Sequence, residues 1–220
     1  MEDQSDRETE TVSRVRKKTG PREVTMRRRQ DILDAAVKVF ASKGFHAGTL
    51  SDVAELAGMT QAGVLHHFGS KENLLRAVIG YRDSIDSSEA HAAYGVDFFD
   101  HLIATVKQNT TRPGIVQTYV VLSAEAVTED NPGAEYFADR FEGLRELVLS
   151  QVRSLNPPDD PLGDAQLVAA ASNIIALMDG LQVQWLLNRD VDLIKCTTFG
   201  IDAILRSVVA GASGSRIVSD

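Results

Sequence analysis

The residues whose types and spacing suggest chemistry lie between Gly48 and Lys71, in the segment GTLSDVAELAGMTQAGVLHHFGSK. Hydroxyl, amide and cationic side chains recur there at the starts of two short helical patterns. Such groups donate hydrogen bonds to phosphate oxygens and to base edges in the major groove of DNA. Gln61 is the best candidate for reading a base, because its amide can pair bidentately with adenine.

The other candidates for DNA contact have simpler roles. Ala62 and Gly63 are small, so the backbone can approach the groove closely and contact a thymine methyl group. The hydroxyls, imidazole and cations are candidates for phosphate contacts, which carry little sequence information. The predicted DNA-binding residues are Arg27, Arg28, Thr49, Ser51, Thr60, Gln61, Ala62, Gly63, His66 and Lys71.

Two short helices joined by a tight turn must position these groups. Thr49 and Asp52 fit a capping box, which predicts a helix beginning near Leu50, and Thr60 can cap a second helix over about residues 61–67. Glycine at position 58 suits the turn, because it adopts a positive φ without steric cost. This pattern is typical of a helix-turn-helix, whose second helix enters the major groove. An ordinary pair of helices in a helical core is the alternative interpretation.

The same segment resembles a known family. Residues ~27–75 resemble the DNA-binding domain of the TetR family of bacterial transcriptional regulators, through ILDAAVKVFASKGF, Thr49, DVAELAG and the segment ending HHFGSKENLL. Near the other end, DGLQVQWLLNRDVDL resembles the region that forms a four-helix bundle across the dimer in that family. Leu65 is a departure, because the family usually has a tyrosine there, often in contact with phosphate.

The resemblance implies a ligand-responsive regulator, and a repressor before an activator. It would bind a palindromic operator in double-stranded DNA as a homodimer and be released by a small apolar or amphipathic effector. Two other functions stay open, a ligand-independent DNA-binding protein with a packed core and an enzyme on the same helical scaffold.

Charge is distributed unevenly along the 220 residues, whose net charge is −8. Residues 11–82 contain 13 lysines and arginines against 6 acidic residues, whereas residues 83–220 contain 9 against 20. A basic head on an acidic body suits DNA binding, since the body is repelled by phosphate. Residues 1–24 are polar and are predicted to be a disordered basic arm that contacts DNA or, alternatively, a solubilising tail.

The sequence offers no support for catalysis. The five histidines lack metal-ligand spacing, and the segments typical of phosphate loops, nucleophile elbows and zinc proteases are missing. Cys196 is the single cysteine, which excludes an internal disulfide and a cysteine-based zinc site. We therefore expect no enzyme activity, no cofactor and no metal. With no long apolar run and no secretory signal, we also expect no membrane span and a cytoplasmic location.

The remainder of the chain is predicted to be helical, so the expected fold is all-α, with a three-helix DNA-binding domain and a helical ligand-binding and dimerisation domain. The expected boundaries are 1–24 for the arm, 25–70 for the helix-turn-helix domain, 71–210 for the C-terminal domain and 211–220 for a flexible tail.

Two sets of residues carry the predictions for the C-terminal domain. Aromatic side chains with polar neighbours suggest an effector site formed by Phe98, Tyr119, Ser123, Phe137, Phe141, Asn173, Gln182 and Trp185. Apolar faces on the last two long helices suggest a dimer interface formed by Val168, Ala171, Ile175, Met178, Leu186, Ile201, Ile204, Leu205 and Val208. For both sets the alternative is that the side chains only fill the core of one chain.

Overall fold

The computed structural model describes the backbone of residues 21–90 and 95–214, with side chains placed for 23–81 and 95–214. The described residues form α-helices and contain no β-strand. The helices are α1 (Pro21–Ala47), α2 (Leu50–Leu56), α3 (Gln61–Phe68), α4 (Lys71–Ala90), α5 (Val96–Thr110), α6 (Pro113–Glu125), α7 (Ala134–Leu155), α8 (Asp164–Leu187), α9 (Leu193–Val209) and α10 (Gly211–Gly214).

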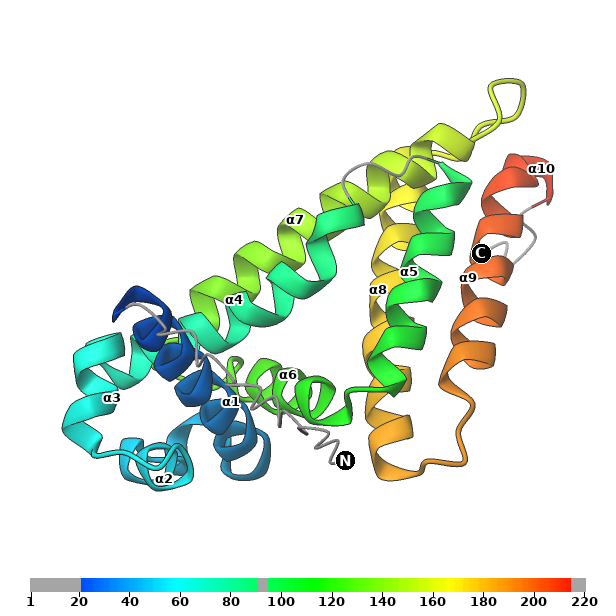
Figure 1. The fold of residues 1–220 in the computed structure, drawn as a ribbon. Coiled ribbons are helices and arrows are strands. Elements are labelled where there is room, and N and C mark those ends of the chain that lie inside the picture. The colour runs from blue at the N-terminus through cyan, green and yellow to red at the C-terminus, as the bar shows by residue number, and fades with distance from the viewer. Residues whose placement is uncertain (1–20, 91–94, 215–220) are drawn as a thin grey trace, which may run out of the picture.

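The N-terminal head consists of α1, α2, α3 and the start of α4, and it lies at one end of the molecule (Figure 1). The apolar stripe of α1 is buried, with Ile32, Ala36 and Phe40 fully shielded from solvent. These residues recur at helical spacing, so one face of α1 packs against the helix-turn-helix. Gly44, at φ 72°, interrupts the regular geometry of α1, and the chain then turns toward α2.

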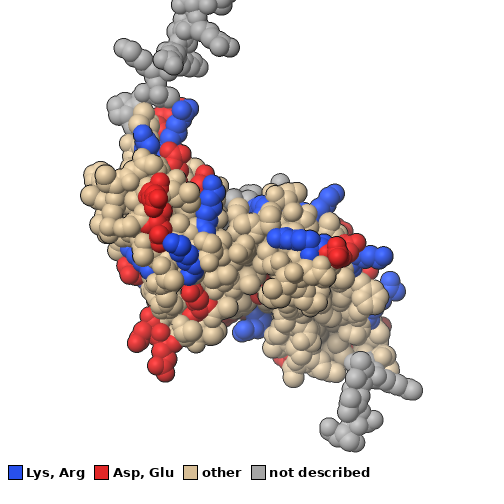
Figure 2. Space-filling view, turned by 90° about the horizontal axis from the view of Figure 1, so that it is seen from below, with Lys and Arg blue, Asp and Glu red and all other residues tan. Residues whose placement is uncertain are grey.

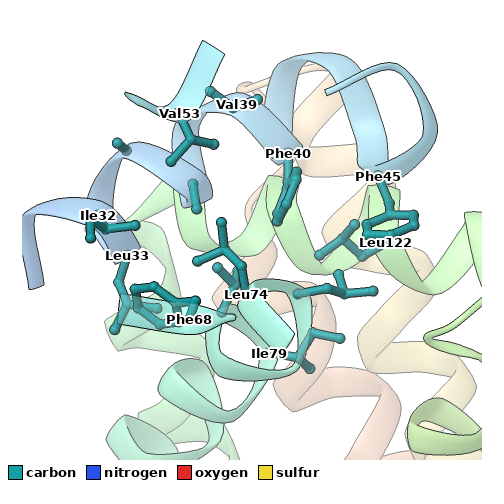
Figure 3. Packing of buried hydrophobic residues seen from close by; sticks show 14 of the residues in the cluster. Ile32, Leu33, Val39, Phe40, Phe45, Val53, Phe68, Leu74, Ile79 and Leu122 are labelled. Carbon is teal, nitrogen blue, oxygen red and sulfur yellow. The ribbon is translucent and has the colours of Figure 1, made fainter. Parts of the chain in front are cut away.

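The core of the head continues into the C-terminal domain. Figure 3 shows Phe40 and Phe45 of α1 close to Leu122 of α6, with Leu74 and Ile79 of α4 nearby. Tyr119 and Phe137, from α6 and α7, belong to the same buried cluster. The expected boundary at residue 70 therefore divides the sequence but not the hydrophobic core.

The rest of the C-terminal domain has two further apolar clusters. One is built around Phe98 and Phe99 of α5, which pack against α7, α8 and α9. The other lies around Trp185 of α8, with Val106 and Leu193. The long helices α5, α8 and α9 stand side by side in Figure 1, and α4 and α7 run from the head toward them.

Two expected boundaries are wrong at the level of a few residues. The helix α1 begins at Pro21, which is favourable in the first helical turn, so residues 21–24 are helical and not part of an arm. Residues 211–214 form α10 and are not a free tail, because the Ala212 and Ser213 amides donate to the Asp160 backbone and carboxylate oxygens at 3.1 and 2.8 Å. The remaining parts of the predicted arm and tail, 1–20 and 215–220, lie outside the described residues.

One described helix, α8, is long and apolar enough to cross a bilayer by length and composition alone. Core helices of water-soluble proteins pass the same test. Leu167, Ala171 and Ile174 of this helix lie in the core of the C-terminal domain. We therefore interpret α8 as a core helix with one apolar face left open.

Candidate nucleic-acid interface and effector region

The start of α2 is fixed by the predicted capping box. The Thr49 hydroxyl accepts a hydrogen bond from the Asp52 amide at 3.1 Å, and the Asp52 carboxylate accepts one from the Thr49 amide at 2.9 Å. Lys43 of α1 adds an ion pair to Asp52 at 2.8 Å. The Lys43 bond, followed by the bonds from Thr49, lowers the pKa of Asp52 to about 2. The network ties the end of α1 to the start of α2.

The turn between α2 and α3 also follows the sequence-based prediction. Gly58 has φ 65°, and the Met59 amide after it donates to the Ala54 carbonyl at 2.9 Å. Ala54 is buried where the two helices meet, so a larger side chain would separate them. At the start of α3 the Thr60 hydroxyl accepts from the Gly63 amide at 3.1 Å.

Gln61 begins α3 and is exposed, as a base-reading residue must be. Its side-chain oxygen is engaged, however, because the Ser51 hydroxyl of α2 donates to it at 3.0 Å. A serine hydroxyl has one proton to donate, so in this arrangement Ser51 cannot also donate to a phosphate. This contact removes the basis for the predicted phosphate role of Ser51 while it bonds to Gln61.

The exposed face of α3 is otherwise small and apolar, with an imidazole. Ala62, Leu65 and His66 are exposed, whereas Gly63 is half-buried. The leucine that replaces the family's tyrosine has no hydroxyl for a phosphate. The face can contact thymine methyl groups and sugars through Ala62 and Leu65, and it can contact polar groups through His66.

Two cations hold this region together, and the sequence analysis assigned neither of them that role. The Arg29 guanidinium lies 4.2 Å from the centre of the Phe68 ring and donates to the His67 carbonyl at 3.0 Å, which anchors the end of α3 to α1. Lys71 lies 4.4 Å from the centre of the Phe45 ring and contacts the His46 carbonyl at 3.4 Å. Lys71, predicted to contact phosphate, is therefore partly occupied by the last turn of α1.

The charge of the head is more mixed than its sequence segment suggested. Figure 2 views the molecule from below, and basic and acidic side chains are interspersed over the visible face of the described residues. Arg27 and Arg28 are exposed near the start of α1, and Arg27 pairs with Glu23 at 3.7 Å. Much of the predicted basic excess comes from Arg14, Arg16, Lys17 and Lys18, which lie outside the described residues.

A row of polar side chains joins α6 to the end of α1. The Gln117 amide donates to the Ala41 carbonyl at 3.0 Å, and the buried Thr118 hydroxyl shares its one proton between the Val37 carbonyl at 3.0 Å and the Gly114 carbonyl of its own helix at 2.8 Å. The Glu125 carboxylate accepts from the Phe45 amide. Movement of α6 must therefore either move α1 or break these bonds. The sequence analysis missed this row because residues about 80 positions apart form it.

A narrow cavity lies at the same junction, between α1, α4, α6 and α7. The cavity volume that a water-sized molecule can occupy is only about 10 Å³, which is room for about one water. Its lining is almost entirely apolar. The lining residues are Val37, Val78, Ile79, Tyr81, Ile115, Thr118, Tyr119, Leu122 and Phe137.

The predicted effector residues do not form one site. Tyr119 and Phe137 both line the junction cavity, with ring centres 5.6 Å apart. Phe98 and Trp185 are buried in two other clusters, and Phe141 lies half-buried between the first and second clusters. The remaining predicted residues are polar and have separate surroundings. Ser123 donates to its own helix, Asn173 is exposed, and Gln182 is buried with its side-chain oxygen unpartnered.

The prediction is therefore wrong for Phe98, Asn173 and Trp185 as members of a common cavity. The two aromatic side chains fill packed core clusters, and the asparagine faces solvent. Helical periodicity identifies a buried face but does not show which of several neighbouring clusters that face enters.

The predicted dimer residues also divide into two groups. Ala171, Ile175, Ile201 and Val208 are buried within one chain, so the prediction that they contact a partner is wrong. Met178, Leu186, Ile204 and Leu205 are half-buried, and Val168 is exposed. Other apolar side chains on the same two helices are much more open. Leu187 is 84% exposed and Phe199 is 77% exposed.

No cluster of histidine, cysteine and acidic residues with metal-binding geometry occurs within the portion of the chain that the structure describes.

Comparisons with known proteins identify the family. A sequence model described as "Bacterial regulatory proteins, tetR family" matches residues 32–78, and one described as "BetI-type transcriptional repressor, C-terminal" matches residues 100–205. The regulator BetI of Rhizobium meliloti is 30% identical over 163 residues, which cover 71% of this chain and 77% of BetI. The chain belongs to the tetR family of bacterial regulatory proteins.

Further tetR-family relatives agree with this assignment. TtgR of Pseudomonas putida is 27% identical over 200 residues, covering 80% of this chain and 90% of TtgR. Among solved structures, a complex of SmeT of Stenotrophomonas maltophilia with triclosan matches 88% of this chain and 100% of that one, with a TM-score of 0.70 and 17% identity. NalD of Pseudomonas aeruginosa matches 85% of this chain and 98% of its own, with a TM-score of 0.67 and 21% identity.

The chain is accordingly a helix-turn-helix transcriptional regulator and not an enzyme. The solved structures support the two-part all-helical fold.

Proposed function

We propose that this tetR-family protein is a homodimeric repressor that binds a palindromic operator and releases it when a small apolar or amphipathic effector binds. The observation that carries the proposal is the physical continuity between the DNA-reading head and the C-terminal domain. The shared core and the bonds from α6 to α1 allow an event in the C-terminal domain to change the position of α3. The match to a repressor-type C-terminal region favours repression over activation. The protein would work where the operator DNA lies, in the cytoplasm.

The dimer interface proposed here is the open apolar face of α8 and α9. On α8 the exposed positions Ala165, Ala169, Ala176, Gly180, Val183 and Leu187 recur at spacings of three, four or seven residues, which places them on one face. Phe199 and Ala203 are exposed on α9, which packs beside α8, and we include them in the proposed interface. Small residues allow close approach of two helices, while Leu187 and Phe199 provide apolar area to bury. Two copies related by a two-fold axis would cover this face and place two α3 helices on one side of DNA.

Phe199→Glu tests the interface. Burying a carboxylate against an apolar partner is costly, so we expect dissociation to a monomer in light scattering after gel filtration and loss of cooperative operator binding. Gln108→Glu, at an exposed position on α5, is the matched control and should remain dimeric. A dimeric Phe199→Glu protein with normal operator affinity would exclude this surface.

The junction cavity is the proposed effector site. Its space is too narrow for a drug-sized molecule, so an effector could enter only if α1, α4 and α6 separate. A ligand that binds such a separated state shifts the population toward it, by an amount set by its differential affinity for the two states. Because Val37 of α1 lines the cavity, separating these helices would directly move the head, to which α1 belongs.

A thermal-shift panel of small aromatic and aliphatic compounds tests this site, because any compound that binds the native dimer raises its melting temperature. Ile115→Phe should fill the half-buried rim of the cavity and abolish the shift given by positive compounds, while operator affinity is kept. Val127→Phe, 87% exposed just after α6, is the control. Positive compounds that still bind Ile115→Phe would place the site elsewhere. A panel without stabilising compounds would favour a ligand-independent regulator.

A further inference from the structure

We propose that Ser51 sets the base preference of Gln61, so that Gln61 reads guanine in preference to adenine. The inference rests on the proposed operator binding and concerns the same surface. It starts from one contact, the 3.0 Å hydrogen bond from the Ser51 hydroxyl to the Gln61 side-chain oxygen. Both residues are exposed and lie in the first turns of α2 and α3, so the contact bridges the two helices at the edge that faces DNA.

The chemistry of the amide decides what Gln61 can read. Bidentate pairing with adenine needs the amide oxygen to accept from adenine N6 while the amide nitrogen donates to N7. Ser51 turns the oxygen toward α2 and occupies one of its two acceptor positions. The amino group, with two protons to donate, is the part of the amide that keeps its full hydrogen-bonding capacity for the groove, whereas the oxygen keeps one acceptor position and is drawn toward α2.

Guanine suits a donor of this kind. Its major-groove edge offers two adjacent acceptors, N7 and O6, whereas adenine places a donor at N6 beside N7. An amino group directed at adenine would gain one bond and face the N6 donor. Ser51 is therefore a positioning residue that acts through Gln61, and the Gln61 amino group is the reading group.

The capping contacts around this pair leave the bridge intact. Thr49 and Asp52 bond to each other, and Asp52 also pairs with Lys43, while Thr60 caps Gly63. Among the described residues, these groups bond to one another and not to the Gln61 amide or the Ser51 hydroxyl. Removing the Ser51 hydroxyl should consequently release the Gln61 oxygen without removing either helix cap.

The experiment selects binding sites from a randomised duplex library with the full-length protein, its Gln61→Ala variant, Ser51→Ala and Ser51→Thr. The base pair whose preference disappears in Gln61→Ala is the one that Gln61 reads. At that pair we expect the unaltered protein to prefer guanine over adenine by about fivefold or more, the discrimination of one hydrogen bond. Ser51→Ala should reduce or reverse this ratio, because the freed oxygen can accept from adenine N6, and Ser51→Thr should keep it.

Three results would overturn the inference. The first is that the unaltered protein prefers adenine at the base pair that Gln61 reads. The second is that Ser51→Ala has the same guanine-to-adenine ratio as the unaltered protein at that base pair. The third is a Ser51→Ala protein that binds all sequences more weakly with an unchanged ratio, since that is the signature of a lost phosphate contact; the salt dependence would stay the same, because serine carries no charge. Failure of the proposed function looks different, because the unaltered protein would then enrich no sequence at all.

Discussion

Replacing Phe40 with alanine tests whether the DNA-binding head and the C-terminal domain unfold as one unit. Phe40 is fully buried in α1, and its cluster includes Leu122 and Tyr119 of α6. A change from phenylalanine to alanine in a core removes apolar contacts and leaves a cavity, which costs about 3–5 kcal/mol. For a protein of this size, each 1 kcal/mol lowers the melting temperature by about 2–4 °C, so the expected decrease is about 6–20 °C.

The change in melting temperature is measured with a probe that lies far from position 40. Trp185 is the single tryptophan, and it is buried in a separate cluster with Val106 and Leu193. Its fluorescence therefore reports the C-terminal domain, whereas far-ultraviolet circular dichroism reports all helices. If the shared core couples the two parts, both signals should shift together in Phe40→Ala. The protein concentration is kept fixed, because the proposed dimer would make the melting temperature depend on it.

The control is Met26→Ala, on the same helix but 65% exposed, which should change stability by no more than about 0.5 kcal/mol. The reasoning is refuted if Phe40→Ala melts in two steps, with an early loss of helix and an unchanged Trp185 transition. Such a result would mean that the head unfolds alone and that the contacts with α6 contribute little free energy.

Three further predictions concern the head and the N-terminal arm. Lys43→Met should raise the pKa of Asp52 from about 2 toward its ordinary value of 3.8, and carboxyl NMR titration measures this pKa. Because the pKa of Asp52 is lower in the folded protein than in the unfolded one, Asp52 stabilises the fold above about pH 3.8, and this contribution is lost as the pH falls toward 2. Replacing the four basic residues at positions 14–18 with glutamine should reduce the salt slope of operator binding by up to about 3.6 if all contact phosphate, and an unchanged slope would support a solubilising tail. Gly44→Ala should destabilise the protein in urea unfolding, since position 44 has φ 72° and alanine is strained there, whereas Gly114→Ala, in an open helical position, should not.

The helix-turn-helix could be predicted from the sequence because its determinants are local. The capping box joins Thr49 to Asp52, three residues apart, and the left-handed turn needs only glycine at position 58. Both are properties of a few neighbouring residues, and the structure has both. Two boundaries in the C-terminal domain have an equally local cause, since Pro113 lies in the first turn of α6 and Pro132 lies just before α7, where neither breaks a helix.

The candidate sites were less predictable because they depend on contacts between distant segments. The sequence predicts that Gln61 is the reading residue, yet the hydroxyl that bonds to its side-chain oxygen belongs to another helix, ten residues earlier. The residues predicted to line one effector site enter three different clusters. For the proposed dimer surface, an apolar stripe in the sequence does not show how far a single chain buries it. Ile201 is buried within its own chain, whereas Phe199, two residues earlier, is 77% exposed.

The contact of Arg29 with α3 has a consequence for how this protein can diverge. Three consecutive arginines at positions 27–29 look interchangeable in the sequence, but only the last has its planar group against the Phe68 ring and the His67 carbonyl. Lysine at position 27 or 28 would keep a mobile positive charge, while lysine at 29 would lose the flat stacking surface and loosen the end of the recognition helix. Natural variants should therefore tolerate exchange at the first two positions and retain arginine at the third wherever an aromatic residue is kept at position 68.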